Sequence, residues 1–159
     1  MNEQGKHFIY PSTLFVSKDR YLIHTILGSC VAVCLYSPKM KIGGMNHYML
    51  PLWNGQGLAS PKFGTIAIPK LIEKMGLLGS NNKFLVAKLF GGANMFESKL
   101  EQFRIGDRNI AIAKEILHEY KIKIVAESTG GELGRKIEFN TYTGEVSQKI
   151  IKKNCKVEV

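Results

Sequence analysis

Two residues of this chain have side chains that can act together as a nucleophile and its base. Cys30 directly follows Gly28-Ser29 and opens an apolar run, and His47 lies in a second apolar run. The thiolate is the reactive form of cysteine, and a nearby imidazolium lowers the thiol pKa from ~8.5 into the physiological range. The two residue types therefore predict nucleophilic chemistry, provided that the fold brings their side chains together.

A β-hairpin is the element that would bring Cys30 and His47 together. The apolar runs 30–36 and 42–50 flank the turn-forming stretch SPKMK. If the turn centres on Pro38-Lys39, Cys30 falls opposite His47, with Cβ atoms about 4.5–5.5 Å apart. A slip of one residue would put the two side chains on opposite faces of the hairpin.

The Gly28-Ser29 turn before Cys30 offers a second chemical feature. Its backbone N–H groups could hold an oxyanion formed when sulfur attacks a carbonyl group, at roughly 3 kcal/mol per donor. Two other interpretations of these residues remain open. Cys30 and His47 can be unrelated core residues, or they can form a zinc site with Cys34. The C-x3-C spacing is unusual for zinc and no CxxC pair accompanies it, so we expect no metal and place Cys34 in the core.

Hydrophobic periodicity predicts the elements that surround the hairpin. The expected strands are 8–16, 20–27, 84–90, 122–127, 135–142 and 145–151, the last two forming a hairpin at Thr143-Gly144. One helix is expected at 65–75, shortened or kinked by Pro69 and ended by Gly76. A second helix is expected at 105–120, with its apolar residues on one stripe. The fold class is therefore α/β, a layered sandwich with a mixed, mostly antiparallel sheet and two main helices.

Composition limits the classes of protein to which this chain can belong. Its 159 residues suit a single domain over 1–159. No stretch approaches the ~20 apolar residues of a membrane helix, and the N-terminal segment is a poor secretory signal, so we expect a cytoplasmic protein. The formal charge of +9 favours an acidic partner. The chain has no aromatic-basic motif of the RNA- or DNA-reading modules, so no nucleic-acid partner is expected.

Five sequence blocks occur in order along the chain. They are LGSCVAVCLY (27–36), GGMNHYMLP (43–51), AKLFGGANMFESK (87–99), IGDRN (105–109) and AESTGG (126–131). Together they resemble the chemoreceptor glutamine deamidase family, CheD. The resemblance implies hydrolysis of glutamine side-chain amides on methyl-accepting chemotaxis receptors, without a cofactor. It also implies a fold similar to the deamidase domain of the cytotoxic necrotizing factor toxins.

The resemblance also assigns roles to residues of the site. Cys30 would be the nucleophile and His47 the base. A threonine of the family precedes the Gly-Ser-Cys turn, and Thr25 matches it, while the neighbouring His24 is the alternative. Both cannot point into the site from a regular strand.

Two glycines and the family's partners complete the expectations. Gly91 and Gly92 either border the substrate or form a plain turn at the end of a strand. The expected partners are the receptors and a CheC-type phosphatase, and a monomer is expected. The segment 96–99 could serve substrate, partner or packing, and Cys155 is expected to be an incidental exposed thiol. The alternative function within the family is a non-catalytic interaction module that regulates the phosphatase or the receptors.

Overall fold

Two β-sheets and two helices make up the computed structural model, which describes residues 4–94 and 104–152. The four-stranded sheet has the order β1 (Gly5–Phe8), β3 (Tyr21–Leu27), β8 (Arg135–Asn140), β9 (Val146–Ile150). The five-stranded sheet has the order β2 (Thr13–Ser17), β5 (Ile42–His47), β4 (Val31–Ser37), β6 (Val86–Gly91), β7 (Lys123–Thr129). The helices are α1 (Gly64–Leu77) and α2 (Ile105–Glu119), and a short 3₁₀ helix spans Asn82–Phe84.

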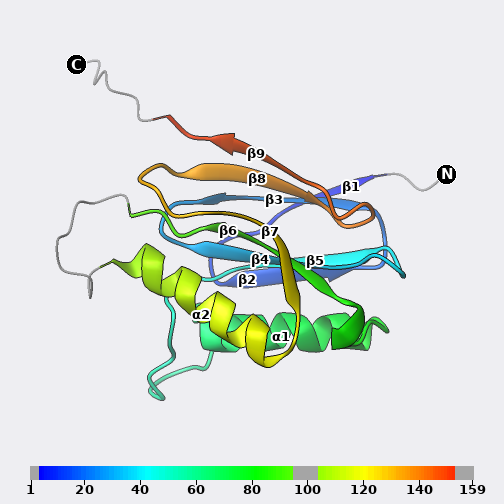
Figure 1. Cartoon of the computed structure of the whole chain (residues 1–159), viewed down its shortest axis with the longest axis horizontal. Coiled ribbons are helices and arrows are strands. Elements are labelled where there is room, and N and C mark those ends of the chain that lie inside the picture. The colour runs from blue at the N-terminus through cyan, green and yellow to red at the C-terminus, as the bar shows by residue number, and fades with distance from the viewer. Residues whose placement is uncertain (1–3, 95–103, 153–159) are drawn as a thin grey trace.

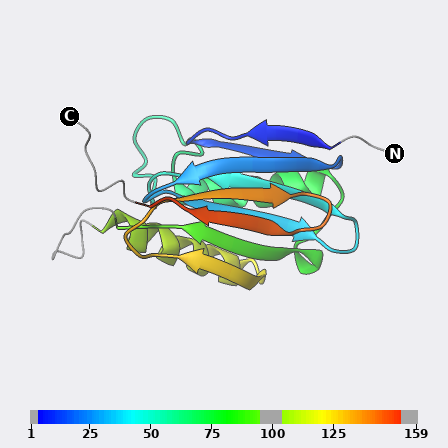
Figure 2. The same cartoon turned by 90° about the horizontal axis from the view of Figure 1, so that it is seen from above.

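The elements form three layers, with the five-stranded sheet in the middle (Figure 1). One apolar cluster joins that sheet to α1 and α2, and a second lies between the two sheets. The view from above shows the four-stranded sheet in front and the helices behind (Figure 2). Strand β4 is buried at all seven of its positions because both of its faces are covered. The residues that directly follow Cys30 are therefore held between layers.

This architecture confirms the predicted α/β class with two main helices and a mixed, mostly antiparallel arrangement. The pairs β1·β3 and β6·β7 are parallel, and the other strand pairs are antiparallel. The division into two separate sheets was not predicted. Helix α2 and the hairpin of β8 and β9 lie where they were expected. Strand β7 runs on to Thr129, two residues beyond the predicted end of the strand at 127.

The predicted strand at 8–16 is wrong, because the structure divides this stretch between the two sheets. Strand β1 pairs with β3 and ends at Phe8, whereas β2 pairs with β5 and begins at Thr13. The connection turns at Pro11-Ser12, and Ser12 adopts a φ of 71°. A fixed proline φ followed by a left-handed residue is incompatible with a continuous strand.

Helix α1 is longer than predicted, because Pro69 does not shorten it and it continues past Gly76 to Leu77. Proline removes one backbone hydrogen bond from a helix. Ile68, Leu71 and Ile72 on either side of it are nevertheless buried in the core, so packing maintains the helix. The left-handed residue after the helix is Gly79, with a φ of 103°, the conformation that glycine favours at a helix C-terminus.

The hairpin of β4 and β5 forms as predicted, but its register is displaced by two residues. Cys34 pairs with Met45 and Ser37 with Ile42, because four residues form the loop and the Lys41 N–H donates to the Ser37 carbonyl at 2.8 Å. The isolated bridge between Val31 and Tyr48 continues the same register. A displacement of two keeps every side chain on its predicted face of the sheet.

No helix in the part of the chain that the structure describes is long and apolar enough to cross a membrane. The predictions for 96–99 and Cys155 lie outside the described residues.

Candidate active site

A hydrogen bond between the two sheets forms the centre of the site. Thr25 on β3 and His47 on β5 are both buried, and the threonine Oγ1 lies 2.7 Å from the imidazole Nδ1. The same hydroxyl donates to the Ile9 carbonyl oxygen at 2.8 Å. A carbonyl oxygen can only accept, so the single proton of the hydroxyl is already committed. Nδ1 of His47 must therefore carry the hydrogen and donate it to Thr25.

The other ring nitrogen of His47 is consequently left as a bare acceptor. Nε2 is buried and has no hydrogen-bond partner among residues 4–94 and 104–152. Burial lowers the pKa of His47 to about 4, because the charged ring is disfavoured away from water. Near pH 7 the imidazole is thus neutral, with a lone pair on Nε2 that no other group uses. This is the form that a general base requires.

Cys30 lies at the end of the turn before β4 and packs against the inter-sheet cluster. Continuing the register from the bridge between Val31 and Tyr48 places Cys30 opposite Met49 and not opposite His47. The predicted direct opposition is therefore wrong, although the predicted face is right. Cys30 and His47 are diagonal neighbours, a relation with Cα atoms roughly 7–8 Å apart. The structure shows no hydrogen bond between the thiol and the imidazole.

The resting thiol is neutral, contrary to the expectation of a lowered pKa. Burial raises the pKa of Cys30, and a hydrogen bond with its own backbone opposes this only in part. The imidazolium that would lower it is absent, because His47 is itself neutral. The fully buried Cys34 is a core residue, as predicted, and its pKa is also raised by burial.

Every carbonyl of the turn before Cys30 is held by a neighbouring element. Gly28 accepts from the Ala93 N–H at 3.0 Å, and Cys30 accepts from the Gly92 N–H at 2.9 Å. The carbonyl of Ser29 accepts from a side chain of α2 at 3.0 Å. The N–H groups of Ser29 and Cys30 donate no hydrogen bond to another residue in the described segments. The Cys30 N–H interacts only with its own sulfur, so both groups can donate to an acceptor from outside the chain.

Gly91 and Gly92 lie behind this turn, at the end of β6. Both adopt positive φ values, of 104° and 71°. A Cβ atom on Gly91 would collide with the Cys30 carbonyl oxygen, and one on Gly92 would collide with the side chain of Ile110. Gly91 thus allows the end of β6 to approach the Cys30 backbone closely, and Gly92 allows α2 to approach the residues after β6. Their expected contact with substrate stays a prediction.

The alternation of β3 separates the two candidates for the third site residue. Thr25 faces inward, toward His47. His24 is half-buried, and its ring lies edge-on to that of Phe8, with centroids 5.1 Å apart. Of the predicted residues, the structure joins Thr25 to His47 by a hydrogen bond and brings Cys30 to the same face.

Asn109 is a residue of this region that the sequence reasoning missed. It is completely buried on α2, and its Nδ2 donates to the carbonyl oxygens of Ser29 and Met49, each at 3.0 Å. The signal was present in the sequence, because an asparagine four residues after Ile105 lies on the apolar stripe of that helix. A polar side chain on a buried stripe needs hydrogen-bond partners.

No metal-binding cluster accompanies these residues. Within 4–94 and 104–152, no three His, Cys, Asp or Glu side chains are grouped so that they could hold an ion.

Comparison with known proteins shows to which family the chain belongs. The family model described as CheD chemotactic sensory transduction matches residues 49–150. A probable chemoreceptor glutamine deamidase CheD of Sulfurimonas denitrificans is 53% identical over 153 residues, covering 95% of this chain and 97% of that protein. A protein of the same name from Trichlorobacter lovleyi is 49% identical over 141 residues, covering 89% of this chain and 88% of that protein. The chemoreceptor glutamine deamidase CheD of Thermotoga maritima is 42% identical over 132 residues, covering 82% of this chain and 83% of that protein. The chain therefore belongs to the CheD family.

Proposed function

We propose that this protein is a chemoreceptor glutamine deamidase, which converts glutamine side chains of methyl-accepting chemotaxis receptors to glutamate and releases ammonia. Relatives that match most of the chain carry that name. The structural observation that carries the proposal is the bond between Thr25 and His47, which leaves Nε2 as a free base on the face where Cys30 lies.

The first step is attack by Cys30 on the carboxamide carbon of the glutamine. The thiol proton moves to Nε2 of His47, and the sulfur forms a bond to carbon. The free N–H groups of Ser29 and Cys30 are the donors for the oxyanion. The resulting imidazolium keeps its Nδ1–H on the oxygen of Thr25, so the same hydrogen bond supports both protonation states.

The second half of the reaction releases both products. The imidazolium gives its proton to the departing nitrogen, the carbon–nitrogen bond breaks, and ammonia leaves a thioester on Cys30. His47 then takes a proton from water, whose oxygen attacks the thioester. Cleavage of the carbon–sulfur bond returns the thiol and leaves glutamate. One water is consumed for each ammonia, and no step needs a cofactor.

Substrate binding has to bring the thiol and the base into contact. Both groups are neutral at rest, and they are not hydrogen-bonded to each other. Catalytic hydrogen bonds commonly tighten only when substrate is present. We infer that a neutral pair, and not a preformed thiolate–imidazolium pair, is the resting state of this enzyme.

One observation favours the alternative of a non-catalytic interaction module, namely that Cys30 and His47 are not hydrogen-bonded to each other. An ammonia-release assay on a purified receptor cytoplasmic fragment decides between the two. Cys30→Ala should abolish turnover, by at least ~10³-fold. Cys34→Ala is the matched control, because it removes the other described cysteine, which is buried in the core. Equal ammonia release by wild type and Cys30→Ala would refute the deamidase mechanism.

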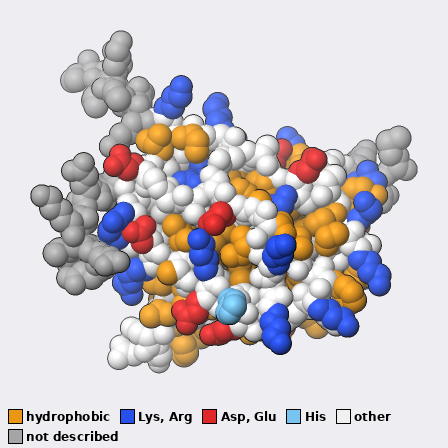
Figure 3. Space-filling view, in the orientation of Figure 1, with side chains coloured by type: hydrophobic (Ala, Val, Ile, Leu, Met, Phe, Trp, Pro, Cys, Tyr) orange, Lys and Arg blue, Asp and Glu red, His pale blue; other side chains and the backbone are white. Residues whose placement is uncertain are grey.

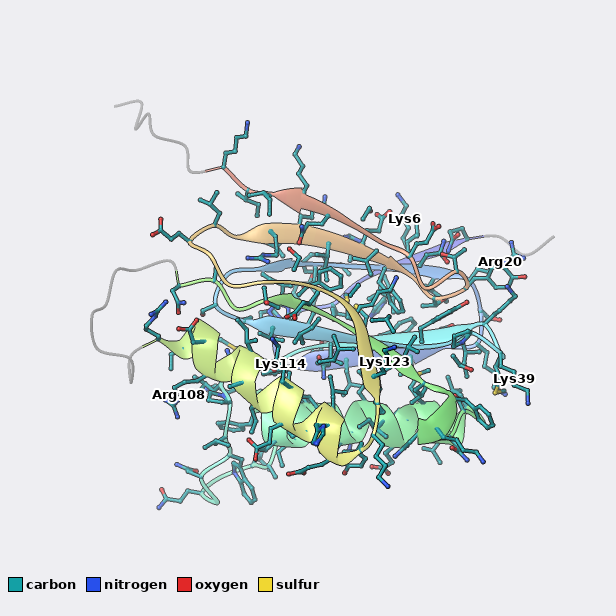
Figure 4. The ribbon with its side chains drawn as sticks, viewed as in Figure 1. Lys6, Arg20, Lys39, Arg108, Lys114 and Lys123 are labelled. Atoms are coloured by element: carbon teal, nitrogen blue, oxygen red, sulfur yellow. The ribbon has the colours of Figure 1, made fainter. Side chains whose placement is uncertain are left out.

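On the face shown in Figure 3, the described basic side chains are spread over several elements and are not gathered into one stripe. The six labelled in Figure 4, which come from both sheets, two connecting turns and α2, are Lys6, Arg20, Lys39, Arg108, Lys114 and Lys123. Such a distribution suits general attraction to an acidic receptor surface.

The remaining expectations stand as proposals beside the activity. They are a single domain over 1–159, a fold similar to that of the cytotoxic necrotizing factor deamidases, a CheC-type phosphatase as second partner, a monomeric state and a cytoplasmic location. Family membership supports the partner, and the layered α/β arrangement supports the fold similarity.

A further inference from the structure

We propose that Asn109 is a positioning residue of this enzyme, which ties the turn carrying Cys30 to the strand carrying His47 through two hydrogen bonds from one amide nitrogen. The inference rests on the proposed function. It concerns a residue outside the Cys30, His47 and Thr25 arrangement.

The hydrogen bonds of Asn109 begin where the backbone ladder of the hairpin stops. The last rung joins Val31 and Tyr48 through N–H to O bonds of 3.1 and 3.0 Å. One residue further, the Met49 N–H turns away to the Lys62 carbonyl at 2.8 Å. The carbonyls of Met49 and of Ser29, on the opposite strand, both accept from Asn109 Nδ2. The side chain thus replaces the next rung, beside Cys30.

Helix α2 holds this side chain in a fixed place. The carbonyl of Asn109 accepts a 2.5 Å hydrogen bond from the hydroxyl of Tyr48, the residue after His47. One turn earlier, Gly106 lies so close to the carbonyls of Gly92 and Ala93 that an added Cβ would collide with both. The helix therefore rests directly on the backbone that supports the Cys30 turn. A shift of Asn109 would need a shift of the helix.

Bridging the Ser29 and Met49 carbonyls requires the amide group of Asn109 and not only a side chain of its size. Both hydrogens of Nδ2 are used, while Oδ1 is buried without a hydrogen-bond partner in the described part of the chain. Aspartate has nearly the same shape, but its carboxylate offers no donor and repels the two carbonyls. Asn109→Asp therefore removes the bridge with little change in volume, and Asn109→Ala removes it without adding charge.

The test compares these two variants with Leu117→Ala. Leu117 is buried on the same helix but packs in the core between α2 and the five-stranded sheet. For each protein we would measure kcat and KM for receptor deamidation, the thermal midpoint, and the pH dependence of Cys30 alkylation by iodoacetamide. Cys30 is distinguished from the other cysteines by peptide mass spectrometry.

Loss of the bridge should lower kcat by ~10–10²-fold, as a misplacement of about 1 Å does in other enzymes, and KM should change less. The alkylation midpoint of Cys30 should move to lower pH, because a released turn exposes the thiol to water. Leu117→Ala should lower the thermal midpoint and leave the alkylation midpoint in place.

The inference is overturned if kcat and the alkylation midpoint of both Asn109 variants equal those of Leu117→Ala. A wild-type protein that releases no ammonia would refute the proposed function instead. The alkylation measurement would then still decide the role of Asn109.

Discussion

Replacement of Thr25 by valine is the most direct test of how His47 is held. Valine keeps the branched shape but removes the hydroxyl that accepts from Nδ1 at 2.7 Å and donates to the Ile9 carbonyl at 2.8 Å. Two buried groups then lose their partner, at about 1–3 kcal/mol each. We expect the free energy of unfolding to fall by roughly 2–6 kcal/mol.

The effect on catalysis follows from the same bond. In the transition state His47 is charged, and a hydrogen bond to a charged group contributes about 1.5–3 kcal/mol. At 1.36 kcal/mol for each factor of ten, its loss slows turnover by roughly 10–10²-fold. The neutral ring is also free to move its proton to Nε2, which would remove the base and increase the loss.

Steady-state ammonia release gives kcat, and thermal unfolding gives the change in stability. Thr25→Ser is the matched control, because it keeps the hydroxyl and loses one methyl group. Serine should retain kcat within a few-fold while valine does not. If Thr25→Val keeps kcat within twofold of wild type, His47 is oriented by something other than Thr25 and the reasoning fails.

Two further predictions concern His47 and Gly91. Because burial lowers the pKa of His47 from 6.5 to about 4, the unfolded chain binds a proton that the folded chain does not over this range. Stability should therefore be lost as pH falls from 6.5 to 4, by about 3 kcal/mol. Urea unfolding at a series of pH values measures this loss of stability. The His47→Gln variant should not show it, because it has no imidazole at this position. Gly91→Ala should cost more stability than Gly131→Ala and should reduce turnover. Both positions have positive φ, but only Gly91 lies against Cys30, and nothing lies within 4 Å of a Cβ at Gly131. Equal losses for the two alanine variants would contradict the role given to Gly91.

Local patterns were enough to predict most elements and the residue types of the site. Apolar periodicity located α2 and the hairpin of β4 and β5, and the order of the five blocks indicated the family that the comparisons confirm. Parity along β3 also implied that only one of His24 and Thr25 could face the site. These inferences need only the periodicity of residues along helices and strands and the order of the blocks along the chain.

The remaining features depend on contacts that no local pattern encodes. The hairpin register was set by a four-residue loop closed at Ser37 and Lys41, and not by the position of Pro38 alone. The separation of the sheets, and with it the break at Ser12, follows from which strands β1 and β2 find as partners. The role of Asn109 depends on α2 lying across the hairpin, which is a long-range contact.

The origin of Thr25 and His47 in different sheets has a consequence for partly folded forms of this protein. A molten globule keeps helices and strands but loses fixed packing between layers. In such a state β3 and β5 can each exist while the bond between them does not, so the imidazole has no defined tautomer. Turnover would therefore disappear with the near-ultraviolet circular dichroism signal and not with the far-ultraviolet signal. Enzymatic activity in this fold reports the contact between two layers, which measurements of secondary structure alone do not detect.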